Sequence, residues 1–342
     1  MTQLLTEILS QPKTILNCFR ENIDKTQEIA RVVREKQIKY IVTAARGTSD
    51  NACTYFKYLC EVNSAYAVSS ASPSVLTVYG GEVNYKDALV IGVSQSGQAQ
   101  DVLAVLSSAR AQGAVTVAIT NFTDSPMAQS AQFHLYLNVG EERALAATKT
   151  YTAQILVLTL LCDALCEKKD LELGDRASKL LSAVCALESQ IEEVASKYAD
   201  IENCYILGRG YAYPLALECA LKMMETTYVR AHGFAISDFY HGPFAVVDGG
   251  SAVVLLAPSD ETLADSIAMY KRLQETDARV IVFSDSQEFV GASSVVKLPK
   301  CSSKEMPYAY LCAMQLFVEK LAIKKGRNAD SPRGLKKVTI TK

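Results

Sequence analysis

Apolar residues in this chain alternate between short runs and longer stretches with helical spacing. Residues 39–44, 88–93 and 115–120 are apolar and partly β-branched, which is typical of buried strands. Residues 12–36 and the segment after Asp101 carry apolar side chains three and four positions apart, which predicts helices. Strands that alternate with helices predict a parallel sheet with right-handed crossovers.

The second half of the chain repeats the first at a spacing of 163 residues. Arg46 returns as Arg209, and residues 115–120 return as residues 278–283. The sequence therefore predicts a duplicated α/β unit, with two doubly wound parallel sheets in three-layer α/β/α form. A long apolar helix is expected to open at residues 140–142. The expected divisions are an N-terminal helical segment (1–38), a first domain (39–167), a charged helical connector (168–200), a second domain (201–325) and a C-terminal tail (326–342).

The loop Ser94-Gln95-Ser96-Gly97 lies between a predicted strand and a predicted helix. Free backbone N–H groups and the helix dipole meet at such a joint, so a phosphate is its natural ligand. The alternative is an ordinary strand–turn–helix joint with a capping serine. In the second repeat Ala257-Pro258-Ser259-Asp260 stands in its place, where proline lacks an N–H and the carboxylate repels anions. We therefore expect a phosphate in the first half only.

A narrow charged stripe crosses the predicted helix at residues 215–228. Glu218, Lys222 and Glu225 are four and three positions apart, so they share one face of an otherwise apolar helix. The stripe could face a cleft, or it could be a solvent-facing ladder of salt bridges. His241 follows in a His-Gly-Pro turn, where it could be either catalytic or structural.

Composition excludes several classes of function. The 342 residues are 49% hydrophobic and 21% charged, with a net charge of −2, so no electrostatic field favours nucleic acid or a membrane. The ten cysteines form no Cys-x-x-Cys motif, and most lie in apolar runs, which predicts free thiols, no metal site and a reducing, cytoplasmic setting. No signal peptide or membrane span is expected.

The chain resembles the sugar-isomerase (SIS) family, in particular the isomerase half of glucosamine-6-phosphate synthase. The resemblance covers nearly the whole chain, and six motifs occur in the family's order. They are Gly47-Thr48-Ser49, Ser94-Gln95-Ser96-Gly97, Glu142 with Ala146-Ala147-Thr148-Lys149, Lys222-x-x-Glu225, His241-Gly242-Pro243 and Pro332-Arg333-x-Leu335-x-Lys337. The resemblance implies a double SIS fold with flavodoxin-like subdomains and no metal or organic cofactor.

The resemblance also implies roles for the matching residues. Glu225 would move a proton between C1 and C2 of an open-chain sugar, with Lys222 assisting, and Lys337 would reach the sugar from the tail. His241 would open the sugar ring, and in relatives this histidine comes from the neighbouring subunit, which implies a homodimer. The phosphosugar itself would be held by Gly47, Thr48, Ser49, Ser94, Gln95, Ser96, Gly97, Glu142, Ala146 and Ala147.

Departures from the family pattern leave the reaction open. Ala99, Ala147 and His232 replace residues usual in the synthase, and Arg46 resembles the deaminase and deglycase branches. Because the chain enters the isomerase region at once, without a glutaminase, we expect glucosamine 6-phosphate to be converted to fructose 6-phosphate and ammonia. The alternatives are a fructosamine 6-phosphate deglycase, a stand-alone phosphosugar isomerase and a non-enzymatic sugar-phosphate sensor.

Overall fold

The chain folds into two compact units, each built from segments distant in sequence. The computed structural model describes residues 1–337. Unit 1 comprises Met1–Pro12, Arg143–Thr148 and Arg176–Leu335. Unit 2 comprises Lys13–Glu142, Lys149–Asp175 and the chain from Lys336 onward.

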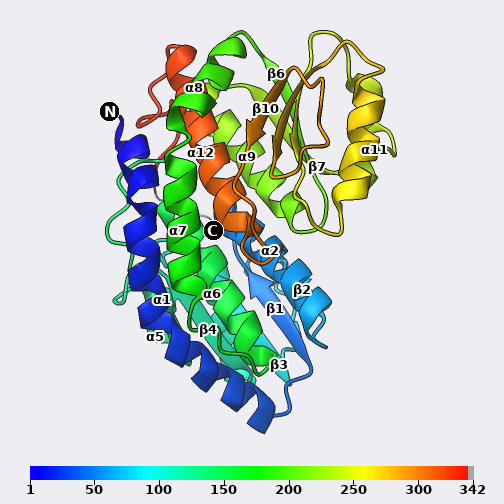
Figure 1. The fold of residues 1–342 in the computed structure, drawn as a ribbon. Helices are drawn as coiled ribbons and strands as arrows, with labels where there is room; N and C mark the ends of the chain where they lie inside the picture. Colours follow the sequence, from blue (N-terminus) through cyan, green and yellow to red (C-terminus); the bar gives the residue numbers. More distant parts are fainter. Residues whose placement is uncertain (338–342) are drawn as a thin grey trace. The chain divides into compact units, whose positions relative to one another are not determined.

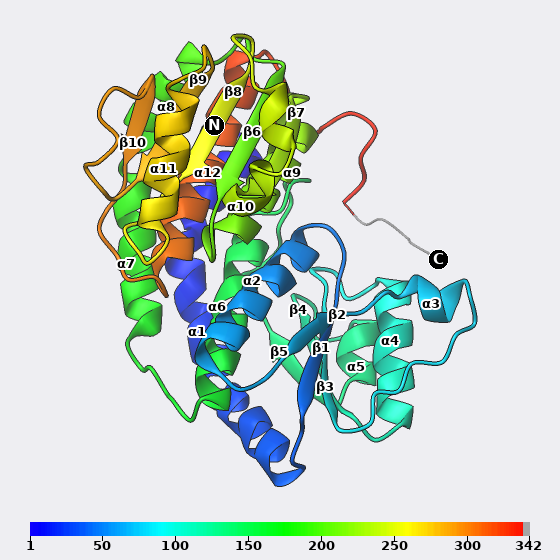
Figure 2. The same ribbon diagram turned by 90° about the vertical axis from the view of Figure 1, so that its right-hand side faces the viewer.

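Unit 2 contains a parallel five-stranded sheet with the order β2-β1-β3-β4-β5. The central strand β3 is buried along its whole length, as its apolar run predicted. Figure 2 shows α4 and α5 on one side of the sheet and α2 with α6 on the other. The elements are β1 (Tyr40–Ala44), α2 (Thr48–Asn63), β2 (Val68–Ser70), α3 (Ser74–Thr77), β3 (Ala88–Val93), α4 (Gln100–Ala111), β4 (Val115–Thr120), α5 (Pro126–Ser130), β5 (Phe133–Tyr136) and α6 (Lys149–Leu165).

Unit 1 contains a second parallel sheet with the order β7-β6-β8-β9-β10. Strand for strand this is the order of the first sheet, which confirms the duplicated α/β fold. In Figure 1, α11 covers one face and α9, α12 and α8 lie on the other. The elements are α8 (Glu188–Lys197), β6 (Asn203–Gly208), α9 (Ala212–Thr227), β7 (Arg230–Ala235), α10 (Ile236–Phe239), η1 (Pro243–Val246), β8 (Ala252–Leu256), α11 (Leu263–Leu273), β9 (Arg279–Ser284), β10 (Ser294–Lys297) and α12 (Met306–Lys324).

Two expected helix starts were wrong. Helix α1 (Gln3–Glu35) begins nine residues earlier than residue 12 and runs through Pro12. Helix α7 (Leu173–Cys185) is the first helix within the expected connector. The long apolar helix begins at Lys149 rather than at residues 140–142. Glu142 instead accepts hydrogen bonds from the backbone N–H of Thr150 (3.1 Å) and from its hydroxyl (2.6 Å). The Glu142 carboxylate thereby pairs a backbone N–H that the first turn of α6 leaves without an intrahelical acceptor.

The segment after α12 returns to the beginning of the chain within unit 1. The Asp330 carboxylate accepts the backbone N–H groups of Gln3 (2.9 Å) and Leu4 (2.8 Å), so it caps helix α1. Ala329 and Pro332 are buried on either side of it. The segment 328–332 is therefore held in place before the tail proper begins.

No helix within residues 1–337 combines the length and the apolar character that crossing a lipid bilayer requires. All ten cysteines are free thiols, and most are buried.

Candidate active site

The loop Ser94-Gln95-Ser96-Gly97 leaves β3 in unit 2 and leads to α4. The Ser94 hydroxyl accepts the Gly97 N–H (3.1 Å), and the Ser96 hydroxyl accepts the Gln98 N–H (3.3 Å). Gly97 adopts φ = 65°, and a Cβ there would overlap the Ser125 side chain. Both serines are half-buried, so their hydroxyl protons can still be donated to a ligand.

A second joint in unit 2 follows β1. Gly47 (φ = 53°) precedes α2, so Thr48 and Ser49 lie in the first turn of that helix. Ser49 is buried, and its hydroxyl accepts from Gln154 of α6 (3.0 Å). Arg46 pairs with the buried Asp101 of α4 at 2.7 Å, which ties this joint to the helix that follows the serine loop.

Electrostatics at this joint favour anions only in part. Burial raises the pKa of Asp50 in the first turn of α2, and the Arg46 charge opposes that rise.

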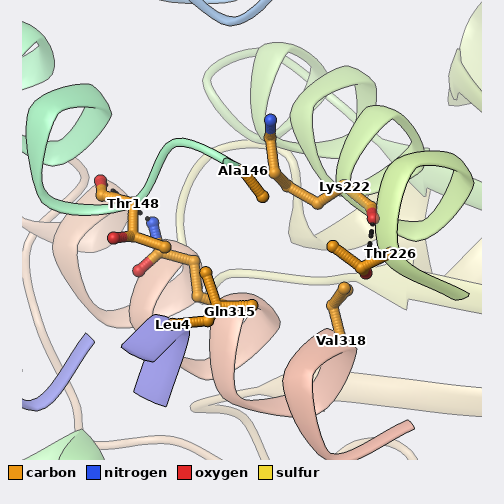
Figure 3. Close-up of a pocket in the computed structure, with 7 residues that line it drawn as sticks. All are labelled: Leu4, Ala146, Thr148, Lys222, Thr226, Gln315 and Val318. Atoms are coloured by element: carbon orange, nitrogen blue, oxygen red, sulfur yellow. Dashed lines mark hydrogen bonds between the residues drawn. The ribbon is translucent and has the colours of Figure 1, made fainter. Parts of the chain in front are cut away.

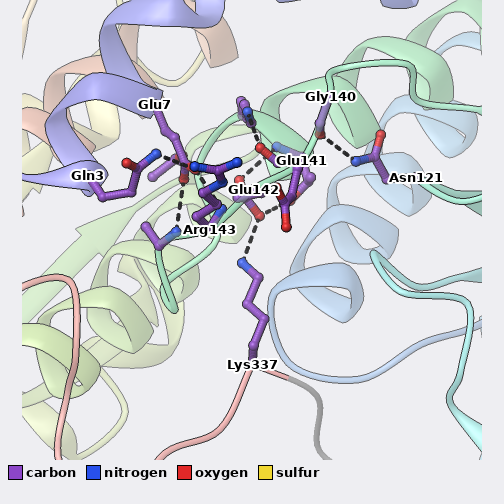
Figure 4. A network of polar contacts seen from close by, with 12 residues as sticks. Gln3, Glu7, Asn121, Gly140, Glu141, Glu142, Arg143 and Lys337 are labelled. Atoms are coloured by element: carbon purple, nitrogen blue, oxygen red, sulfur yellow. Dashed lines mark hydrogen bonds and ion pairs between the residues drawn. The ribbon is translucent and has the colours of Figure 1, made fainter.

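Lys337 and Glu142 meet within unit 2. The Lys337 ammonium lies 3.2 Å from the fully buried Glu142 carboxylate, as Figure 4 shows. The backbone N–H of Arg143, the next residue, donates instead to Glu7 in unit 1 (2.6 Å). Residues 338–342, the rest of the expected tail, lie outside the described residues.

The charged stripe of α9 is buried in unit 1. Lys222 lies 2.5 Å from Glu225 and 3.6 Å from Glu218. The exposed fractions of the three side chains are 7% for Lys222, 3% for Glu218 and 20% for Glu225. A solvent-facing ladder would be open to water, so that alternative was wrong. Burying one cation between two carboxylates costs free energy unless their contacts compensate, and such clusters are common at functional sites.

The stem of Lys222 lines a narrow cavity of about 10 Å³. Figure 3 shows its side chain beside Ala146, with Thr148, Thr226 and Gln315 around the cavity. Gln315 of α12 donates to the Thr148 carbonyl (3.3 Å), which holds the segment 143–148 against α12. Ala146 is buried and Ala147 half-buried in that segment, which belongs to unit 1 and not to the unit of the serine loop.

His241 lies elsewhere in unit 1. It is exposed and lines an open pocket of about 310 Å³ with Arg209, Ser237, Tyr240 and Asp265. This pocket and the Lys222 cavity share no lining residue. The structure thus brings Glu218, Lys222 and Glu225 together within unit 1 but does not place His241 with them.

The counterpart of the serine loop in unit 1 is filled by a side chain of the protein. The buried Asp285 carboxylate accepts the Ser259 N–H (2.8 Å), the Ser259 hydroxyl and the Tyr310 hydroxyl (3.0 Å). Burial and the Asp285 charge raise the pKa of Tyr310, so its hydroxyl remains a donor. In unit 2 the corresponding Asn121 bonds to the Gly140 carbonyl instead.

Three residues described above, Glu218, Asp285 and Gln315, were not among the site residues predicted from the sequence. Glu218 was recognised on the charged face, and its spacing of four from Lys222 was the signal. The repeat at a spacing of 163 pairs Asn121 with Ser284 and so did not mark Asp285, because β9 begins one position later than the repeat predicted. No sequence signal marked Gln315, because only the packing of α12 brings it to the cavity.

Within residues 1–337, no group of three or more His, Cys, Asp or Glu side chains is arranged to hold a metal ion.

Comparison with known proteins gives consistent matches. A family model described as "SIS domain" matches residues 36–164 and 197–295. Glutamine–fructose-6-phosphate aminotransferase (isomerizing) from Pyrococcus horikoshii is 31% identical over 98% of this chain and 57% of its own length. The chain thus spans a little over half the length of the curated relatives that it matches.

Solved structures agree in fold. The C-terminal domain of glucosamine-fructose-6-phosphate aminotransferase from Francisella tularensis superposes with a TM-score of 0.88 at 26% identity, covering 97% of this chain and 98% of that one. Glucosamine-6-phosphate deaminase from Thermotoga maritima gives a TM-score of 0.76 at 18% identity, covering 99% and 100%. At that identity the second likeness establishes the fold alone.

Proposed function

The chain belongs to the SIS domain family, and we propose that it is a phosphosugar isomerase that releases ammonia from an amino-sugar phosphate. The preferred substrate is glucosamine 6-phosphate, and the products are fructose 6-phosphate and ammonia. The observation that carries the proposal is the buried Glu218–Lys222–Glu225 cluster, in which only Glu225 keeps substantial access to solvent. The names of the relatives with 26–31% identity point to the same class of sugar.

The proposed chemistry begins with the open-chain amino aldose, whose phosphate is held by the serine loop and by the first turn of α2. Glu225 removes the proton from C2 while O1 takes up a proton from solvent, which gives an enolamine. The same carboxyl group then returns a proton to C1 as the nitrogen loses a proton to solvent. The resulting imine at C2 adds water and expels ammonia. Lys222, 2.5 Å from Glu225, stabilises the carboxylate before the first proton transfer and after the second.

Two further residues have proposed roles. Lys337 carries an amine that can form an imine with the ketose carbonyl, once it leaves Glu142. His241 opens the sugar ring, because imidazole can exchange a proton near neutral pH. The exposure of His241 and its separate pocket support its action on the site of a second copy in a homodimer.

The primary test measures ammonia and fructose 6-phosphate released from glucosamine 6-phosphate. We expect Glu225→Gln to lower kcat by about 10²- to 10⁴-fold, because the amide cannot carry the proton, while sugar-phosphate binding is retained. Glu193→Gln on α8 is the matched control, since that carboxylate is 71% exposed. Its kcat should equal that of the wild type.

Other outcomes would redirect the proposal. Ammonia-free exchange of the C1 and C2 protons of fructose 6-phosphate would indicate a plain isomerase. Turnover of a fructosamine 6-phosphate alone would indicate a deglycase. Binding of sugar phosphates without turnover of any of them would indicate a sensor.

The proposed sharing of the site has its own test. Glu225→Gln and His241→Ala chains, each inactive alone, should regain up to about a quarter of wild-type activity when unfolded and refolded together, because one of the two sites in a mixed dimer would be intact. A mixture with no more activity than its parts would place His241 outside the partner's site.

A further inference from the structure

The C-terminal segment meets the end of helix α9 at one residue, Tyr228. The backbone N–H of Arg333 donates to the Tyr228 hydroxyl at 2.9 Å. The Arg333 guanidinium lies 4.4 Å from the centre of the Tyr228 ring, and the Arg327 guanidinium lies 5.1 Å from it. All three residues belong to unit 1.

Tyr228 occupies a special place on its helix. It caps the C-terminus of α9 with φ = 60°, a left-handed conformation that costs a bulky residue free energy. In this conformation its ring makes cation–π contacts with two arginines, and each such contact contributes modestly at exposed sites. The same helix carries Glu225, three residues earlier, and Lys222.

We propose that Tyr228 is a positioning residue that tethers the C-terminal tail to the catalytic helix. The inference rests on the proposed function, in which Lys337 reaches the sugar. The tether holds the tail at the Arg333 backbone and leaves the Arg333 and Arg327 side chains stacked on the ring. The Asp330 cap on α1 secures the same segment three residues earlier.

The short chain between Arg333 and Lys337 limits how far the Lys337 backbone can lie from the Tyr228 hydrogen bond. Lys337 lies four positions after the Arg333 tether point. An extended chain of four residues spans at most about 14 Å, so the Lys337 backbone stays within that distance of the tether. Without Tyr228 the next fixed point is the buried Pro332, and the limit lengthens to about 18 Å. The tether therefore raises the effective concentration of the lysine amine near its target.

The test measures how accessible the tail is, independently of activity. Folded wild type, Tyr228→Phe and Tyr228→Leu chains are treated briefly with a lysine-specific endoprotease, and cleavage after Lys336 and Lys337 is followed by mass spectrometry. Tyr228→Phe removes the hydrogen-bonding oxygen and keeps the ring, so cleavage should be about fivefold faster. Tyr228→Leu also removes the ring and should be faster still.

Tyr270→Phe is the matched control in the same unit. It removes a tyrosine hydroxyl that donates to the Val290 carbonyl (3.0 Å), away from the tail. Its tail should be cleaved at the wild-type rate. Equal cleavage of Tyr228→Phe and Tyr270→Phe would overturn the tether, and this holds even if Tyr228→Leu fails to fold.

Kinetics separate the tether from the proposed function. In Tyr228→Phe, kcat for ammonia release should fall about fivefold while KM changes less than twofold, because the phosphate contacts are untouched. A wild-type kcat despite faster tail cleavage would overturn the positioning role. Absence of turnover in the wild type would instead count against the proposed function and leave the cleavage result to decide the tether.

Discussion

The burial of Lys222 decides whether the charged face of α9 is a surface salt-bridge ladder or a candidate site. From spacing alone, a lysine between two glutamates on a helix is more often a surface ladder than a site. The lysine side chain is 7% exposed, and its partners lie at 2.5 and 3.6 Å. Whether the face of α9 meets solvent or protein depends on α12 and on the segment 143–148, which the local sequence of α9 does not encode.

His134 gives a prediction for pH at the same scale. It lies on β5, and its Nε2 is 2.9 Å from the Thr120 hydroxyl. Burial lowers the pKa of His134 below its usual 6.5, and the Lys25 charge adds to this effect. The unfolded chain therefore binds a proton at a higher pH than the folded chain does. The stability contributed by neutral His134 is fully present above pH 6.5 and is lost as the pH falls through the lowered pKa.

The measurement is the free energy of unfolding in urea between pH 7.5 and 5. The wild type should lose more stability over this range than His134→Gln, which carries no titrating group. His232→Gln is the control, since that side chain is exposed, and it should follow the wild type. If His134→Gln and the wild type show the same pH dependence, the attribution to His134 is wrong.

At the scale of elements, the proposed phosphate site depends on the backbone conformation of the joint between β3 and α4. Gly97 has φ = 65°, and an added Cβ would overlap the Ser125 hydroxyl. Gly113, in the turn between α4 and β4, has φ = 80° but open space around it. The two glycines share the conformational requirement and differ in packing.

Gly97→Ala and Gly113→Ala form a matched pair. Each should lower the free energy of unfolding by about 1 kcal/mol through backbone strain. Gly97→Ala should lose about 1–3 kcal/mol more, because the overlap forces the loop to move. Calorimetry should also show sugar-phosphate binding at least tenfold weaker in Gly97→Ala and unchanged in Gly113→Ala. Equal binding by the two variants would argue against the serine loop as the phosphate site.

At the scale of the whole molecule, duplication has produced two similar sheets with unequal loops. Asp285 supplies in unit 1 the negative charge that a ligand phosphate would supply in unit 2. Asp260, the last residue of that loop, is half-buried. This burial raises the pKa of Asp260, while hydrogen bonds from Thr262 lower it. The filled loop adds a physical reason to expect one phosphate per chain.

Calorimetric titration with a sugar phosphate should therefore give one site per chain, and two sites would refute this expectation. Asp285→Ala should lower the free energy of unfolding by about 1–3 kcal/mol, because the Ser259 N–H and the Tyr310 hydroxyl lose their acceptor. Asp277→Ala removes an exposed carboxylate in the turn before β9, at the other end of that strand from Asp285, and should have little effect.

Local patterns predicted much of this molecule and failed where distant segments meet. Residues 88–93 and 115–120 became β3 and β4 without change, because each apolar run is also a buried strand. The start of α6 was misplaced because the sequence does not reveal that Glu142 reaches forward to Thr150. Likewise, the sequence around Asp285 did not indicate that it would accept hydrogen bonds from Ser259. Predicting such contacts requires the folded loops, whereas the strands could be recognised from their own composition.

The capping of α1 by Asp330 has a practical consequence for anyone who shortens or extends this chain. Leu4 and Asp330 are 326 positions apart, yet one carboxylate satisfies the first two amides of the opening helix. A truncation before Asp330 would leave those two amides to water at a cost of about 1 kcal/mol. A change at either end of the chain therefore affects the hydrogen bonds of the other end.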